Sequence, residues 1–102
     1  MNKDDFDRPL IEALITTATF LEQYGETLWS DILRKEAGRD PLDRASIRAI
    51  FGGMGSFNDL MLSPDNRHKI LETEVKAANL RLDELGTRIF DLARSKPPFR
   101  DP

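Results

Sequence analysis

Apolar residues in this chain recur at intervals of three and four, the repeat of a helix that buries one face. The longest such run is Leu71, Val75, Ala78, Leu82, Leu85, Ile89 and Leu92. A similar run near the N-terminus is Leu10, Ile11, Leu14, Ile15, Ala18, Leu21 and Tyr24. No stretch alternates apolar and polar residues with the β-branched content of a strand. The spacing therefore predicts an all-α fold whose C-terminal helix lies along other helices.

Prolines and glycines mark where these helices begin and end. A capping side chain stands at or next to a proline at Asp7-Arg8-Pro9, Asp40-Pro41 and Ser63-Pro64. A glycine follows an apolar stretch at Gly25, Gly38 and Gly52, where a left-handed residue would end a helix. Two pairs fit the capping-box spacing, Asp40 with Asp43 and Ser56 with Asp59. Together the signals predict a bundle of three shorter helices and one long C-terminal helix, over about 8–24, 27–37, 41–51 and 64–95.

The two helices in the middle of the chain are too short for a long periodic pattern, so only a few residues indicate which face of each helix is buried. The second is expected to bury Leu28 or Trp29 together with Ile32 and Leu33. The third is expected to bury four residues, Leu42, Ala45, Ala49 and Ile50. Both faces would pack against the two longer helices.

The length of 102 residues fits one domain, so residues 1–102 are expected to form a single helical domain. The first five residues form a polar segment without an apolar core, and residues 1–6 are expected to be flexible. Residues 96–102 hold three prolines, which cannot continue a helix, and are expected to form an extended tail that lays Phe99 on a neighbouring surface. The polar N-terminus and the short apolar runs predict a cytoplasmic protein that has no signal peptide and does not enter a membrane.

Composition excludes several classes of site. The chain has no cysteine and a single histidine, His68, which excludes disulfide scaffolds, thiolate nucleophiles, zinc fingers, iron–sulfur clusters and multi-histidine metal sites. We therefore expect no metal and no cofactor. The 15 basic and 18 acidic residues leave a net charge of −3, which argues against non-specific binding to nucleic acid.

A glycine-rich segment in the middle of the chain is the strongest candidate for a binding loop. Its candidate residues are Gly52, Gly53, Gly55, Ser56, Asn58 and Asp59. It is not a Walker A loop, because no Gly-Lys-Ser/Thr follows, and the third glycine of a dinucleotide fingerprint is replaced by Asn58. The GxxG of a KH domain is present, but without the sheet that such a domain needs.

Two interpretations of this loop remain open. Its amides could hold a carboxylate or a phosphate, as exposed N–H groups before a capped turn do. Alternatively, the loop is a corner that brings Phe51, Met54 and Phe57 into the core, while Asn58 and Asp59 bond to loop amides.

The run Gly-Gly-Met-Gly-Ser-Phe-Asn-Asp-Leu at residues 52–60 resembles the signature of a family of small uncharacterised bacterial proteins, a domain of unknown function. In that family a helical half containing a tryptophan, here Trp29, precedes the motif, and a leucine-rich helix follows it. The resemblance covers about residues 10–92. It implies a bacterial origin and a compact helical fold, and it brings no established activity or catalytic residues. Such proteins often look like immunity or accessory proteins encoded beside toxins.

Other charged and polar residues are better explained as ordinary surface or packing residues. His68 precedes the long apolar run by one step and is expected to be packed or half-exposed. Neither His68 nor Ser56 has a partner at a recognisable catalytic spacing, so we expect no enzyme. The basic residues Arg34, Lys35, Arg39, Arg44 and Arg48 could suggest a helix-turn-helix. Acidic residues interleave with them, which argues against nucleic-acid binding.

The long helix is the clearest clue to a partner. About 31 residues would span about 46 Å, more than the diameter of a compact domain of this size. Leu80, Asp83 and Glu84 are the candidate partner-binding residues on it, and Gly86 is expected to admit another helix. The sequence thus predicts a non-enzymatic interaction module, immunity-like or accessory to a toxin, that binds a protein partner or a second copy. The alternatives are small-ligand or anion binding by the Gly52–Asp59 loop, and a nucleic-acid-binding regulator.

Overall fold

The computed structural model describes residues 2–97. These residues form four α-helices and three single-turn 3-10 helices, with no strand among them. The α-helices are α1 (Lys3–Gln23), α2 (Thr27–Ala37), α3 (Arg44–Ala49) and α4 (Val75–Arg94). The 3-10 helices are η1 (Phe57–Asp59), η2 (Pro64–Asn66) and η3 (Glu72–Glu74). The prediction of an all-α fold with a long C-terminal helix is confirmed.

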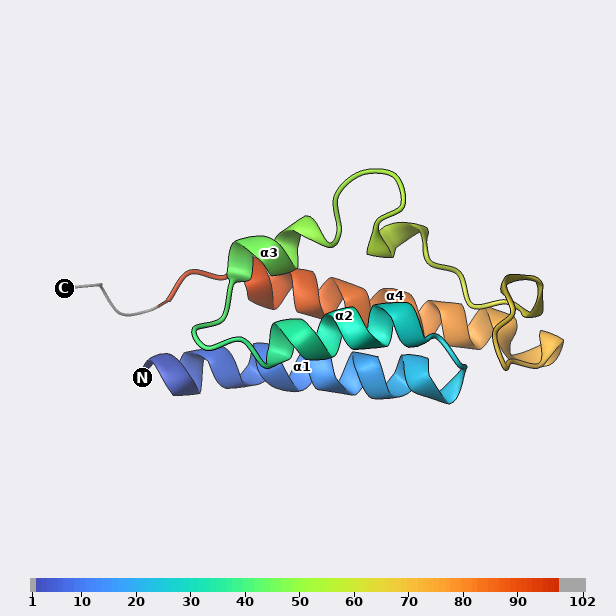
Figure 1. Cartoon of the computed structure of the whole chain (residues 1–102), viewed down its shortest axis with the longest axis horizontal. Coiled ribbons are helices and arrows are strands. Elements are labelled where there is room, and N and C mark those ends of the chain that lie inside the picture. Colours follow the sequence, from blue (N-terminus) through green and yellow to red (C-terminus); the bar gives the residue numbers. More distant parts are fainter. Residues whose placement is uncertain (1, 98–102) are drawn as a thin grey trace.

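The helices form an elongated bundle of 52 × 24 × 20 Å. Figure 1 shows α1 and α2 as an antiparallel hairpin, with α4 running along α1 in the opposite direction. The short α3 lies over the C-terminal part of α4. The connection from α3 to η1 arches away from the helices before the chain returns to α4. This connection and α4 together build the site described below.

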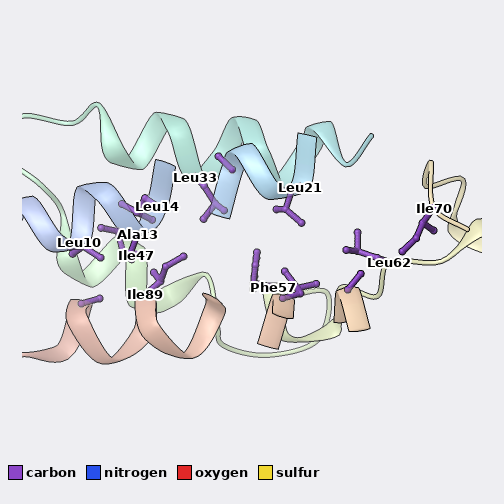
Figure 2. Packing of buried hydrophobic residues seen from close by; sticks show 14 residues of the cluster. Leu10, Ala13, Leu14, Leu21, Leu33, Ile47, Phe57, Leu62, Ile70 and Ile89 are labelled. Atoms are coloured by element: carbon purple, nitrogen blue, oxygen red, sulfur yellow. The ribbon is translucent and has the colours of Figure 1, made fainter. Parts of the chain in front are cut away.

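One continuous apolar cluster joins all four α-helices (Figure 2). Its fully buried members include Leu10, Leu14 and Leu21 of α1, Leu33 of α2, Ile47 of α3 and Ile89 of α4. Leu62 and Ile70 extend the cluster into the chain that precedes α4. Because each fully buried aliphatic side chain contributes about 1.5–3 kcal/mol, this cluster is the main source of stability.

Helix α1 begins five residues earlier than predicted. The side chain of Asn2 accepts a hydrogen bond from the Asp5 amide and caps the helix, so residues 3–6, expected to be flexible, form its first turn. Pro9 lies inside the helix. Asp7, expected as a cap, is instead buried beside Arg44.

The next two helices match the prediction more closely. Helix α2 has the predicted bounds, with the Glu26 side chain capping it at the Trp29 amide. Helix α3 begins at Arg44 because Asp43, rather than Asp40, caps it through the Ser46 amide. Its buried residue is Ile47, which the sequence pattern missed, whereas Ala45 and Ala49 are exposed.

Helix α4 begins eleven residues later than predicted, at Val75. Ser63 and Pro64 do start a helix, but it is the single turn η2, which ends where Arg67 adopts a left-handed conformation with φ 64°. The Lys69 amide then donates to the Tyr24 carbonyl, which holds this segment on the α1–α2 turn. The 20 residues of α4 span about 30 Å, so the predicted helix that is longer than the domain is not observed. The predicted tail over 96–102 lies outside the described residues after Pro97.

Candidate functional site

The chain between α3 and η2 makes a sharp corner, called here the glycine corner, residues 50–60. Gly53 and Gly55 have φ of 79° and 74°, left-handed values that glycine adopts without strain. Met54 between them is fully exposed, so the prediction that it enters the core is wrong. Because the two glycines turn the backbone outward, Met54 is held away from the helices.

Hydrogen bonds brace this corner from within. The Asp59 carboxylate accepts from the Gly55 amide at 2.7 Å, and the Asn58 side chain donates to the Phe51 carbonyl at 2.8 Å. The Phe57 amide donates to the Ile50 carbonyl at 2.9 Å. Asp59 therefore already accepts the hydrogen bond of one of the loop amides that a bound anion would need.

A chain of aromatic rings connects the corner to α2 and α4. The ring of Phe57 lies 5.5 Å from that of Trp29 and 5.3 Å from that of Phe51, and Phe51 lies 5.6 Å from Phe90. A Cβ atom on Gly86 would stand 3.1 Å from the Phe57 ring and 3.5 Å from the Phe51 ring. The close approach that Gly86 permits is thus by two rings of the corner, not by another helix.

A pocket of about 310 Å³ opens between the glycine corner and α4. Its apolar lining residues are Phe51, Phe57, Leu60, Met61, Leu82 and Phe90. Its polar lining residues are Asn58, Asn79, Asp83 and Thr87, with Gly86 in the wall. Among the described residues no lysine, arginine or histidine lines it, so this pocket, called here the corner pocket, has a single charge, the carboxylate of Asp83.

Asn79 fixes one wall of the corner pocket. Its side-chain oxygen accepts from the Leu62 amide, and its side-chain nitrogen donates to the carbonyls of Leu62 and Val75, all at 2.8 Å. Leu62 is fully buried, so these bonds satisfy backbone groups that water does not reach. The segment that carries Leu60 and Met61 is thereby tied to α4.

The three candidate partner-binding residues of α4 have different surroundings. Asp83 is exposed and lines the corner pocket, and its side chain makes no hydrogen bond or ion pair with any described residue. Leu80 is 63% exposed one turn away, outside the pocket lining. Glu84 forms an exposed 3.5 Å pair with Arg81 rather than with Arg88, the partner four residues on that the sequence spacing favours.

A second hollow, of about 270 Å³, lies on the other side of the corner. Gly55, Ser56 and Asp59 reach it, together with Glu26 and His68. The Ser56 hydroxyl is buried and has no hydrogen-bond partner within residues 2–97. The structure thus divides the candidate loop: Asn58 lines the corner pocket, and Ser56 with Asp59 lines the second hollow.

His68 belongs to a loop rather than to α4, and both of its ring nitrogens are engaged. Nδ1 accepts from the Ser63 amide at 3.1 Å, which assigns the ring proton to Nε2, 3.1 Å from Glu26. The other Glu26 oxygen caps α2 at the Trp29 amide. Because neither nitrogen is free to take a proton from Ser56, this group is a structural bridge and not a catalytic triad.

Most of the basic residues around the α2–α3 connection form hydrogen bonds or ion pairs within the chain. Arg34 donates from Nε and Nη2 to both oxygens of Glu22, and this hydrogen bonding lowers the pKa of Glu22 below its usual range. Arg39 pairs with Glu36 at 2.8 Å. Arg44 and Arg48 donate to the carbonyls of Leu92 and Ala93 in the last turn of α4, where carbonyl groups lack the regular helical donor four residues on. Each of these four guanidinium groups already has an acceptor within the chain.

The described residues contain neither a cluster of metal-ligating side chains nor a helix that could span a membrane. No group of three or more His, Cys, Asp or Glu residues stands close enough to hold a metal ion. None of the described helices has the length and apolar character that crossing a bilayer requires.

A protein-family model described as "Domain of unknown function (DUF6966)" matches residues 22–71. The matched segment contains Trp29, the glycine corner and the His68 bridge, and it stops before α4. Neither the search of curated proteins nor the search of solved structures found a match.

Proposed function

We propose that this chain is a non-enzymatic, cytoplasmic interaction module of bacterial origin that binds a protein partner over the corner pocket and the outer face of α4. The observation that supports it is the corner pocket itself, an aromatic-lined seat of about 310 Å³ with the unpaired carboxylate of Asp83 at its edge. Pockets that accept one anchoring side chain beside a polar rim are typical of protein interfaces.

The charges beside the corner pocket, rather than those of α4 as a whole, favour a basic partner: three carboxylates and one cation, Arg88, are the charged groups among the described residues that line the hollow next to it. Asp83, Glu84 and Asp91 lie on the exposed surface of α4 beside the corner pocket. The whole chain carries a net charge of −3. An acidic surface accelerates encounter with a basic protein, as neutralisation of a nucleic-acid-cleaving toxin would require. An immunity or accessory protein is therefore the specific role we propose.

The geometry gives the other candidate functions less support. Anion binding by the Gly52–Asp59 loop is opposed by Asp59, which holds the Gly55 amide, and by Glu26, which lines the second hollow. Binding of nucleic acid would need the arginines that the chain uses internally. For catalysis, the buried Ser56 hydroxyl has no free base beside it.

The experiment uses the chain as bait in a lysate of the organism that encodes it, followed by reconstitution with the purified candidate partner. Titration calorimetry then compares three baits: the unchanged chain, Asp83→Lys and Glu12→Lys. Glu12 is an exposed carboxylate of α1, far from the corner pocket in sequence, and provides the matched charge reversal.

We expect a basic partner whose affinity falls at least tenfold with Asp83→Lys and less than twofold with Glu12→Lys. Equal affinity for all three baits contradicts the proposed surface. Light scattering tests self-association through the same face: we expect the 11.6 kDa mass of one chain. Twice that mass, reduced to one chain by Leu80→Glu, would assign the face to a second copy instead.

A further inference from the structure

We infer that the corner pocket is the seat for one apolar side chain of a basic amphipathic helix, whose lysine or arginine residues face the acidic side of α4. The inference rests on the proposed function and specifies the element of the partner that binds. It follows from the lining of the pocket, from the charges beside it and from the secondary structure that surrounds it.

The seat suits an aliphatic or aromatic side chain. Rings of Phe51, Phe57 and Phe90 form its wall, and Met61 at its edge is 58% exposed. Met54, also in the glycine corner, is fully exposed. Methionine side chains adapt to differently shaped apolar partners, and they are enriched where helical segments of varied sequence bind. A volume of about 310 Å³ accommodates one large side chain rather than a whole helix face.

Helix α4 carries four basic and three acidic side chains, but its three carboxylates gather on one side, next to the corner pocket. Asp83, Thr87 and Asp91 follow one another at four-residue intervals, so they form a ridge about 12 Å long. A shallow hollow of about 580 Å³ flanks the ridge, and Arg88 is the one cation among the described residues that line it. Asp91 pairs with Arg94 at 3.6 Å, but both side chains are more than half exposed, so an incoming cation can replace Arg94.

The surrounding structure favours a helix as the bound element. The described residues contain no strand, so a partner cannot add a strand to an exposed edge. The ridge runs parallel to the axis of α4, and a helix that packs beside it presents residues at the same one-turn spacing. An apolar anchor in the seat then places lysine or arginine residues, one turn away on either side, next to the ridge.

The test uses two synthetic peptides of 18 residues, each labelled with fluorescein and each with a leucine stripe at helical spacing. The polar face is all lysine in one peptide and all glutamate in the other. Fluorescence anisotropy at low salt measures binding to the full chain, and circular dichroism checks that each variant is folded. We expect the lysine peptide to bind and the glutamate peptide to bind at least tenfold more weakly.

Two variants distinguish binding of the peptide in the corner pocket from its non-specific attraction to the charge of the chain. Asp83→Lys should weaken the lysine peptide at least fivefold, and Thr87→Trp, which fills the pocket without changing charge, should also weaken it at least fivefold. Glu12→Lys should change its affinity less than twofold. The inference is overturned if the lysine peptide does not bind, or if Asp83→Lys and Glu12→Lys weaken it equally.

The outcome remains distinguishable from that of the proposed function. If a reconstituted natural partner binds with the expected sensitivity to Asp83→Lys while the lysine peptide does not bind, the inference about the helix fails and the proposed function stands. If the peptide binds at the seat and no natural partner does, the proposed function fails.

Discussion

Single residues show how tightly the corner pocket is built. Gly86 is the clearest case, because two aromatic rings, those of Phe57 and Phe51, stand where its Cβ atom would point. Glycine inside a helix costs about 1 kcal/mol relative to alanine. That cost is offset here by the contact that Phe57 makes with the helix. The sequence predicted a close approach at Gly86 by another helix, whereas the groups that approach are the rings of Phe57 and Phe51.

Gly86→Ala is expected to destabilise the chain by about 1 kcal/mol, although alanine favours the helix. The new methyl group would meet Phe57 at 3.1 Å, and Trp29 and Phe51 prevent that ring from moving away. Urea unfolding measures the change. Gly38→Ala is the matched control, since Gly38 has an ordinary φ of −88° and a Cβ there makes normal contacts. A gain in stability for Gly86→Ala would show that the rings are loosely packed.

Asp7 and Arg44 form a largely buried ion pair at 2.8 Å, and Arg44 also donates to the Leu92 carbonyl at 2.6 Å. Arg44→Met should therefore cost about 2–3 kcal/mol, because it leaves the Asp7 carboxylate buried without a cation. Adding Asp7→Asn should restore at least about 1 kcal/mol of that loss. Urea unfolding of the two single variants and the double variant measures the coupling. Additive losses would mean that the pair contributes nothing specific.

The pKa of Glu22 is lowered first by its hydrogen bonds from Arg34 and then by the positive charge of Arg34. A carboxylate with a lowered folded-state pKa stabilises the fold above its unfolded pKa, and that contribution is lost as pH falls through the folded value. Arg34→Gln should return the Glu22 pKa to its usual range, and Arg34→Lys should return it only partly. NMR titration of the Glu22 carboxyl carbon measures this. An unchanged value in Arg34→Gln contradicts the assignment.

At the scale of elements, the helix predictions from the sequence were most accurate where one apolar pattern repeats over many turns. Helix α2 has the predicted bounds, and most of the α4 apolar run is buried, Ala78, Leu82, Leu85 and Ile89 among it. The start of α4 was predicted wrongly because Ser63 and Pro64 give a genuine start signal that only one turn follows. Local capping cannot show that the next segment is held by a distant carbonyl, that of Tyr24.

Short elements were harder to predict for a related reason. Helix α3 has six residues, too few for periodicity to identify Ile47 as its buried face. Its position is set by Arg44 and Arg48, which donate to carbonyl groups of α4. These contacts join residues 48 and 45 positions apart in the chain, and no pattern in a single sequence marks them.

Asn79 is expected to control how firmly the corner pocket holds its shape. Asn79→Ala removes the partners of the Leu62 amide and carbonyl, so we expect a loss of about 2 kcal/mol and faster hydrogen exchange at Leu62. Asn79→Asp retains the acceptor but not the donor, and should give a smaller loss. Hydrogen-exchange mass spectrometry with urea unfolding tests both. Unchanged exchange at Leu62 in Asn79→Ala would show that other contacts hold this segment.

At the scale of the whole molecule, the site arises because the chain returns to α4 through the glycine corner. The sequence singled out both parts, residues 52–59 and the outer face of α4, but it did not predict that they line one pocket. Their union depends on Phe51 and Phe57 packing on Gly86, which brings Asn58 and Asp83 to one pocket. A single sequence cannot show this pairing, because residues 60–74, which form only two single-turn helices, lie between the two parts.

The most direct measurement is an amide chemical-shift map of the ¹⁵N-labelled chain during titration with the leucine–lysine helix. We expect the perturbed amides to cluster at residues 51–61 and 79–91, on both sides of the corner pocket. The same titration of Thr87→Trp should lose these shifts. Perturbations spread over the exposed faces of α1 and α2, or confined to the second hollow near His68, would contradict the assignment of this face as the binding site.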